Sequence, residues 1–169
     1  MKDHTPIKRH QAIVSFSKDH HFGLLLAWKI RQGLEKAVNA ERISKYVLYF
    51  FKEDLEKHFK DEELLLFCKL PESDTLRERA EADHQSIYNL INAIDENKND
   101  TKLLNQLANE LETHIRFEER ELFNHLQNKI TPEDLQLIEK RTPNSGKSID
   151  EKWEDVFWEI KKYENGYPG

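Results

Sequence analysis

The sequence predicts an all-α fold, an up-down antiparallel four-helix bundle with a short C-terminal helical extension. Three observations lead to this prediction. Only 5 Gly and 5 Pro occur in 169 residues, and the interior of the chain has long stretches with neither. Apolar residues recur at the 3.6-residue spacing of a helix in four successive segments. The connections between these segments are short, which makes sequential helices antiparallel neighbours.

The four long helices are expected at residues 17–39, 42–69, 73–96 and 101–128. Ser17 is the expected N-cap of the first helix and Asp100 that of the fourth, because their side-chain oxygens can accept from free backbone N–H groups. Pro71 is expected to stop the second helix at residue 69, because proline interrupts helical hydrogen bonding. Helices of this length extend over about 34–42 Å, which is enough to form a complete bundle.

The chain changes character after the fourth helix. We therefore divide it into a bundle with its N-terminal lead-in, residues 1–130, and a C-terminal extension, residues 131–169. Thr131 and Pro132 predict a capped short helix, and a linker rich in Pro, Ser, Gly and Asn follows at 141–147. An amphipathic segment then predicts either a tail helix packed on the bundle or a helix that docks a protein partner through 150–163. Its apolar positions are Trp153, Val156, Phe157 and Ile160.

Composition excludes several classes of protein. A net charge of −6 without a basic stripe argues against nucleic-acid binding. The longest apolar runs are too short to cross a bilayer, and the N-terminal lead-in lacks the apolar core of a signal peptide. The single cysteine, Cys68, excludes an internal disulfide and is expected to be a small core residue. We expect a soluble cytoplasmic protein without nucleic-acid or membrane partners.

One stretch of the sequence is repeated. Residues 55–67 align with residues 111–123, and seven of the 13 positions are identical, where chance would give about one. The second and fourth helices are therefore related units, and each half of the bundle is a helix pair.

Each unit contains the motif His-x-x-x-Glu, formed by His58 with Glu62 and by His114 with Glu118. Positions i and i+4 lie on one face of a helix, so the imidazole and carboxylate of each motif can reach the same metal ion. Both histidines share their faces with apolar residues, among them Phe51 for His58 and Leu107 for His114, and are expected to point into the core. A buried glutamate beside each would be costly unless it is paired or binds metal.

The other two helices supply one histidine each. His84 follows Asp83, and His20 follows Asp19, so the Asp-His pair is repeated as well. His21 is the alternative to His20, but helical phase favours His20, whose face is the more apolar. Imidazole and carboxylate ligands without thiolate suit iron, manganese or zinc. The predicted metal ligands are His20, His58, Glu62, His84, His114 and Glu118.

Residues near these ligands allow two interpretations each. Asp54 and Glu110, one turn before His58 and His114, either orient the imidazoles or form a solvated helix flank. Tyr88 either borders the site or fills the core, and Gly23 either leaves room for a ligand or permits close helix packing. His125 lies about 16 Å along the helix from His114, too far to join the site.

Residues 15–129 resemble the hemerythrin-like, or HHE cation-binding, domains. The resemblance rests on Asp19-His20-His21, His58 to Glu63, Asp83-His84 and His114 to Glu119. It implies two non-heme iron ions, bridged by an oxo or hydroxo group, inside a four-helix bundle. By this resemblance the four histidines are terminal ligands, and Glu62 and Glu118 are bridging carboxylates. Tyr88 stands where the oxygen carriers have a fifth histidine, and Glu118 where they have aspartate, so the chain is more similar to the four-histidine bacterial branch.

Three functions follow from these observations. The leading hypothesis is a di-iron protein that binds or senses dioxygen, nitric oxide or peroxide, or that handles iron. The second is a structural or storage module for zinc or a single iron, and manganese is a further candidate metal. The third is a helical scaffold that docks a partner through its C-terminal segment. The pattern indicates a metal-binding or sensor protein rather than a classical enzyme, and it leaves the oligomeric state open.

Overall fold

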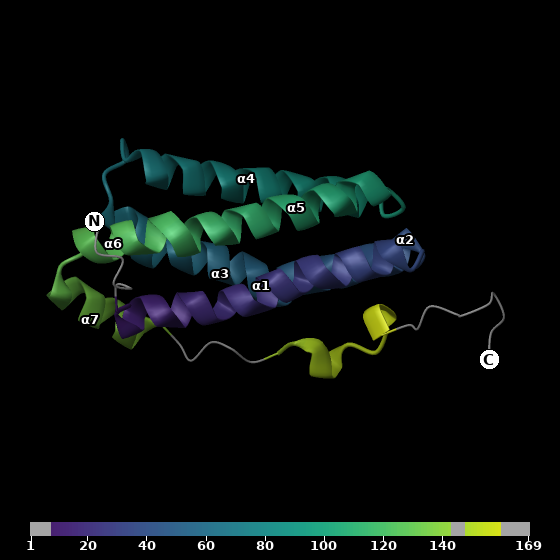
Figure 1. Ribbon diagram of the computed structural model, residues 1–169, viewed down its shortest axis with the longest axis horizontal. Coiled ribbons are helices and arrows are strands. Elements are labelled where there is room, and N and C mark those ends of the chain that lie inside the picture. Colours follow the sequence, from purple (N-terminus) through teal and green to yellow (C-terminus); the bar gives the residue numbers. More distant parts are fainter. Residues whose placement is uncertain (1–7, 143–147, 160–169) are drawn as a thin grey trace, which may run out of the picture.

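The computed structural model describes residues 8–142 and 148–159, and within them all regular secondary structure is helical. Long helices run side by side along the molecule, with α4 next to α5 and α1 next to α2 and α5 (Figure 1). The all-α prediction is confirmed. The elements of the bundle are α1 (Gln11–Glu35), α2 (Ala40–Phe50), η1 (Phe51–Leu55), α3 (Glu56–Asp61), η2 (Glu62–Leu66), η3 (Phe67–Lys69), α4 (Thr75–Glu96), α5 (Thr101–Phe117), η4 (Glu118–Leu122) and α6 (Phe123–Lys129).

The start of α1 differs from the prediction. The helix begins at Gln11, and the His10 side chain caps it by accepting from the backbone N–H of Ala12. Ser17, the expected N-cap, lies inside the helix instead, and its hydroxyl donates to Glu119. The helix ends at Glu35, before the predicted residue 39, because Ala37 has a φ of 54° and the chain leaves the helical region there.

The second and fourth long helices contain π-helical turns. η1 and η2 interrupt the second helix, and η4 interrupts the fourth; each adds one residue to a helical turn. This addition changes which residues face inward. Phe50 is 3% exposed while Phe51, expected on the histidine face, is only partly buried. The equivalent helix around Leu107 has no π turn, and Leu107 is fully buried as expected.

The predicted caps of the later helices are confirmed. Asp100 accepts from two backbone N–H groups at the start of α5, as predicted; Asp74, which was not predicted as a cap, does the same at the start of α4. Thr131 caps α7 (Pro132–Arg141), which has proline in its first turn and packs against α1.

The C-terminal segment does not form the predicted amphipathic helix. It contains two short 3₁₀ turns, η5 (Asp150–Lys152) and η6 (Phe157–Glu159), with non-helical residues between them, and Ile160 lies outside the described residues. Phe157 is fully buried and Trp158 is 8% exposed, because both pack on Tyr46 of the bundle. Packing against the bundle, rather than helical hydrogen bonding, fixes this segment.

The core consists of two apolar clusters with a polar layer between them. In α1, Phe16 belongs to one cluster and Leu26 to the other, with His20 between them. In α4, Ala80 and Ile87 flank His84 in the same way. None of the described helices is both long and apolar enough to cross a membrane. Cys68, expected in the core, is exposed at the end of the second helix.

Candidate metal centre

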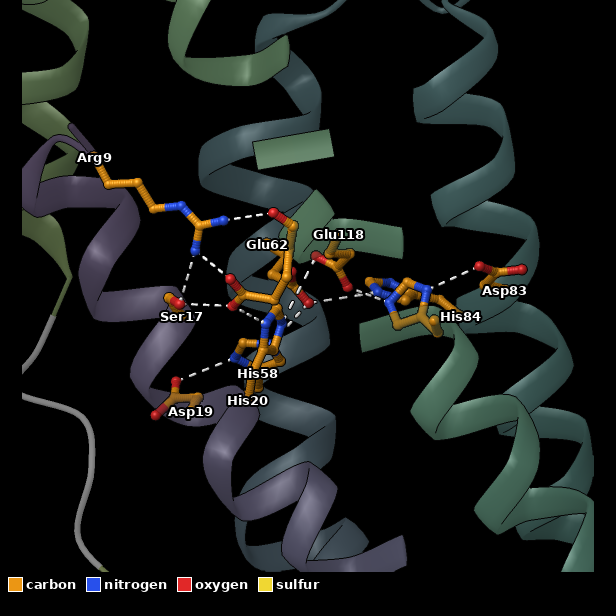
Figure 2. A network of polar contacts seen from close by, with 11 residues as sticks. Arg9, Ser17, Asp19, His20, His58, Glu62, Asp83, His84 and Glu118 are labelled. Carbon is orange, nitrogen blue, oxygen red and sulfur yellow. Dashed lines mark hydrogen bonds and ion pairs between the residues drawn. The ribbon is translucent and has the colours of Figure 1, made fainter. Parts of the chain in front are cut away.

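The six predicted ligands come together in the polar layer. His20, His58, His84 and His114 are at most 6% exposed, and Glu62 and Glu118 are fully buried. His20 is buried and His21 is exposed, so the prediction from helical phase that His20 points inward is confirmed. The fold thus brings together six side chains from four helical segments that lie far apart in the sequence (Figure 2).

The six residues form two overlapping groups. One contains Glu62, His84, His114 and Glu118, and the other contains His20, His58 and Glu62; in each, one ligand atom per residue lies within 4.8 Å of all the others. The Glu62 Oε1 atom lies 2.9 Å from His58 Nε2 and 3.5 Å from His84 Nε2. Glu118 contacts His114 Nε2, and its Oε2 atom lies 3.9 Å from His20 Nε2. Each glutamate therefore lies between two histidines of different helix pairs.

Each histidine has a carboxylate behind it on a neighbouring helix. The Nδ1 atoms of His20, His58, His84 and His114 lie 2.7–3.1 Å from Glu119, Asp19, Glu63 and Asp83, respectively. An ionised carboxylate only accepts hydrogen bonds, so each Nδ1 must donate, and each Nε2 faces the centre, where it offers a lone pair once the ring is neutral. This is the tautomer that a metal-binding histidine needs.

These orienting carboxylates were missed by sequence reasoning. Of the two interpretations left open for Asp54 and Glu110, orientation of the imidazoles is excluded: Glu110 accepts from Ser86 instead, and no described hydrogen bond joins Asp54 to His58. The sequence does contain a pattern that could have identified them: each orienting residue is a direct neighbour of a predicted ligand and belongs to a repeated Asp-His or Glu-Glu pair.

Unsatisfied polar atoms show that the centre fits a metal. Among the described residues, eight buried side-chain N and O atoms have no hydrogen-bond partner. They are the Nε2 atoms of the four histidines and both carboxylate oxygens of the two glutamates. Buried polar atoms are normally paired, so such a set needs an explanation such as a bound ion. Imidazole nitrogens and carboxylate oxygens are the donors that iron, manganese and zinc accept.

The metal-free centre holds protons. Burial alone lowers the pKa of His58, His84 and His114, but the neighbouring carboxylates outweigh it; Glu62 raises the pKa of His58 well above its ordinary value, and Glu118 raises that of His114 to about 10. Burial and the Glu62 carboxylate raise the pKa of Glu118. For Glu62, the His58 imidazole outweighs burial and holds the pKa well below its ordinary value. A metal ion would displace the imidazole protons.

The carboxylate behind His20 has further partners. Arg9 donates to the Glu119 carboxylate and to its backbone carbonyl, and the Ser17 hydroxyl donates to the same carboxylate at 2.6 Å (Figure 2). Burial raises the pKa of Glu119, but the hydrogen bonds from His20, Ser17 and Arg9 outweigh it and lower the value to about 2. Glu119 is therefore fixed as an ionised acceptor.

A small cavity adjoins the histidines. It offers about 10 Å³ to the centre of a water-sized molecule, roughly the room for one water or one diatomic molecule. Its lining includes three of the candidate ligand histidines, and apolar side chains form most of the remaining wall. A Cβ atom at Gly23 would lie 2.7 Å from Ile115 Cδ1, so this glycine permits close helix packing and also borders the cavity. Burial and the nearby Asp19 carboxylate raise the pKa of Asp54, another lining residue, to about 6.

The remaining candidates lie outside the centre. Tyr88 packs edge to face on Phe51 and Phe59, so it fills the core and does not line the cavity. His125 bonds to Asp74, the N-cap of α4, through an Nε2–Oδ2 distance of 2.6 Å, as expected for a histidine remote from the ligands.

A helical bundle with a buried layer of imidazoles and carboxylates is the architecture of a cation-binding bundle protein. The profile of the hemerythrin HHE cation binding domain matches residues 12–126, and the chain belongs to this family. The resemblance in the sequence is thus confirmed, and the protein contains a cation-binding helical domain. Searches of curated proteins and of solved structures gave no match.

Proposed function

We propose that the protein is a non-heme di-iron protein of the four-histidine type, and that His20, His58, His84, His114, Glu62 and Glu118 hold the two ions. The observation that carries this proposal is the set of eight buried ligand atoms that form no hydrogen bond and have one another as their charged neighbours. The overlapping groups support two ions rather than one, because Glu62 belongs to both. Residues 12–126, which match the family, support the bundle 1–130 as the metal-binding unit and 131–169 as an extension.

We further propose that the centre binds a small molecule such as dioxygen, nitric oxide or peroxide. Four imidazoles and two bridging carboxylates leave coordination positions of two six-coordinate ions unfilled, and bound iron supplies redox chemistry at such open positions. The cavity beside His20, His58 and His114 supports a ligand of this size. The apolar walls exclude bulk water, and the orienting carboxylates keep the Nε2 lone pairs in place.

Metal content tests the proposal. Protein produced with iron available is expected to contain about two irons per chain by mass spectrometry, with absorption bands in the near-ultraviolet and visible range that change on oxidation and on addition of nitric oxide. The His58→Ala/His114→Ala variant is expected to lose the iron, whereas His21→Ala, a change at an exposed histidine, retains it. Circular dichroism verifies that both variants remain helical.

Other outcomes identify the alternatives. One iron per chain, or zinc without a redox-dependent spectrum, would contradict the di-iron proposal and support a structural or storage module. A chain without metal, unchanged by the double substitution, would leave a helical scaffold and a docking role for the C-terminal segment.

A further inference from the structure

The cavity beside the candidate centre has one polar wall residue with no assigned role. Among the polar residues that line it, His20, His58, His114 and Glu118 are candidate ligands, and Asp19 orients His58. Asp54 is the remaining polar residue. Within the described part of the chain its half-buried carboxyl group has no hydrogen-bond or ion-pair partner.

A local irregularity of the helix coincides with this residue. Asp54 lies in the π turn η1, and both Leu55 of the same turn and Phe50 just before it line the cavity as well. π turns inside α-helices occur frequently at functional sites. The two π turns η2 and η4 begin at the candidate bridging glutamates, so η1 is the turn that the ligand set does not explain.

The repeated sequence provides an internal comparison. Glu110 occupies the position equivalent to Asp54 in the second unit, but α5 has no π turn there. The Glu110 carboxylate accepts from Ser86 Oγ at 2.7 Å and from Gln106 Nε2 at 2.9 Å, and it faces an outer groove rather than the cavity. An acidic residue is thus directed to the cavity in one unit only.

We propose that Asp54 is a specificity-determining residue, which makes the cavity accept neutral small molecules in preference to anions. This inference rests on the proposed function, because it concerns the ligand that the metal centre would bind. An anion in the cavity would face the carboxylates of Asp54 and Asp19, and no lysine or arginine lines the cavity to compensate. The repulsion is weakly screened because most of the remaining wall is apolar. Its apolar lining residues are Phe50, Leu55, Phe59, Leu111 and Ile115.

Azide, a linear triatomic anion, and nitric oxide, a neutral diatomic molecule, are the probes for this proposal; each variant is compared with the natural chain for the same probe, so the difference in probe size cancels. The iron-loaded full-length chain is titrated with azide in its oxidised form and with nitric oxide in its reduced form, at pH 8, by visible absorption. Asp54→Asn, which removes the charge and keeps the shape, is expected to tighten azide binding by about tenfold. Nitric oxide affinity is expected to stay within about twofold, and Asp54→Glu retains the weak azide binding of the natural chain.

Glu110→Gln is the matched control, because it removes the same charge from the equivalent position outside the cavity. It is expected to leave both affinities unchanged, and iron content measured for every variant confirms that the centre is intact. Asp54→Ser provides a second uncharged variant if the asparagine chain does not fold.

The outcomes separate this inference from the proposed function. If the natural chain binds both probes but uncharged Asp54 variants bind azide as weakly as it does, the inference alone is overturned. An equal tightening of azide and nitric oxide also overturns it, because cavity shape rather than charge would then be responsible. A natural chain that holds no iron, or responds to neither probe, overturns the proposed function and this inference with it.

Discussion

The two repeated units, residues 55–67 and 111–123, place the same residues toward the centre. The residues around the centre, here called the rim, differ between them. In each unit a histidine and a glutamate point to the centre, a π turn begins at the glutamate, and the following glutamate supports a histidine of another helix. The rims differ at Glu119, which Arg9 and Ser17 hold in place, whereas its counterpart Glu63 is 39% exposed and has no such partners among the described residues. They differ again at Asp54, which lines the cavity, and Glu110, which does not.

This difference separates two requirements of the site. The atoms that face the centre must satisfy the same geometry in both units, because each bridging glutamate has to reach two histidines. The rim has no such constraint, so charge and access can vary there without disturbing the ligands. We therefore propose that the duplicated part defines what the centre can hold and that the unmatched part defines what reaches it.

Removal of a bridging carboxylate should have the largest effect. Glu62 belongs to both ligand groups and Glu118 to one, so Glu62→Gln is expected to lower the iron content more than Glu118→Gln, with a loss of affinity of about a hundredfold or more. Mass spectrometry of the purified variants measures this. The metal-free Glu62→Gln chain should melt below the temperature of the metal-free natural chain, because the buried His58 imidazole loses the carboxylate that pairs with it. Equal iron loss in both variants would contradict the shared role of Glu62.

Removal of the orienting carboxylates should have smaller and matched effects. Asp19 accepts from His58 and Asp83 from His114, at 3.1 and 2.9 Å, so Asp19→Asn and Asp83→Asn are each expected to weaken metal binding by about ten- to a hundredfold. Competition with a chelator of known affinity measures the loss. A large effect of one substitution and none of the other would show that the two units are not equivalent inside.

The metal-free chain should lose stability as pH rises. The pKa of His114, about 10, is raised above the ordinary value near 6.5, and that of His58 is raised as well. A raised folded-state pKa gives stability that is complete below about pH 6.5 and lost as pH rises toward 10. We expect the free energy of unfolding to fall by about 1 kcal/mol or more over this interval. The metal-loaded chain, in which metal replaces these protons, should show no such fall in thermal denaturation followed by circular dichroism.

Loss of the Arg9 contact should have the smallest effect. The pKa of Glu119 is about 2, below its ordinary value of 4.5, so its contribution to stability is present above pH 4.5 and is lost as pH falls toward 2. Arg9→Gln is expected to remove about 1 kcal/mol or less of this contribution, because the pair is partly exposed. Acid denaturation curves of the two chains should converge near pH 2; curves that differ equally at every pH would exclude the Glu119 contact as the cause.

The sequence by itself determined the helices, the repeat and the histidines and glutamates that point into the core. Periodicity identifies the inward face of a helix, and this was sufficient to choose His20 over His21 and to place both His-x-x-x-Glu motifs in the core. The caps at Asp100 and Thr131 were also predictable, because a cap is a local interaction between a side chain and the next few backbone groups.

Only the tertiary structure decided which groups meet across helices. The pairing of Asp19 with His58 and of Glu63 with His84 depends on the relative height and rotation of packed helices, which no spacing within one helix encodes. The π turn at η1 adds a residue without a recognisable sequence signal, and it moved the inward position from Phe51 to Phe50. The C-terminal segment followed the same principle, since its aromatic side chains fit the bundle surface without forming the helix that their spacing predicted.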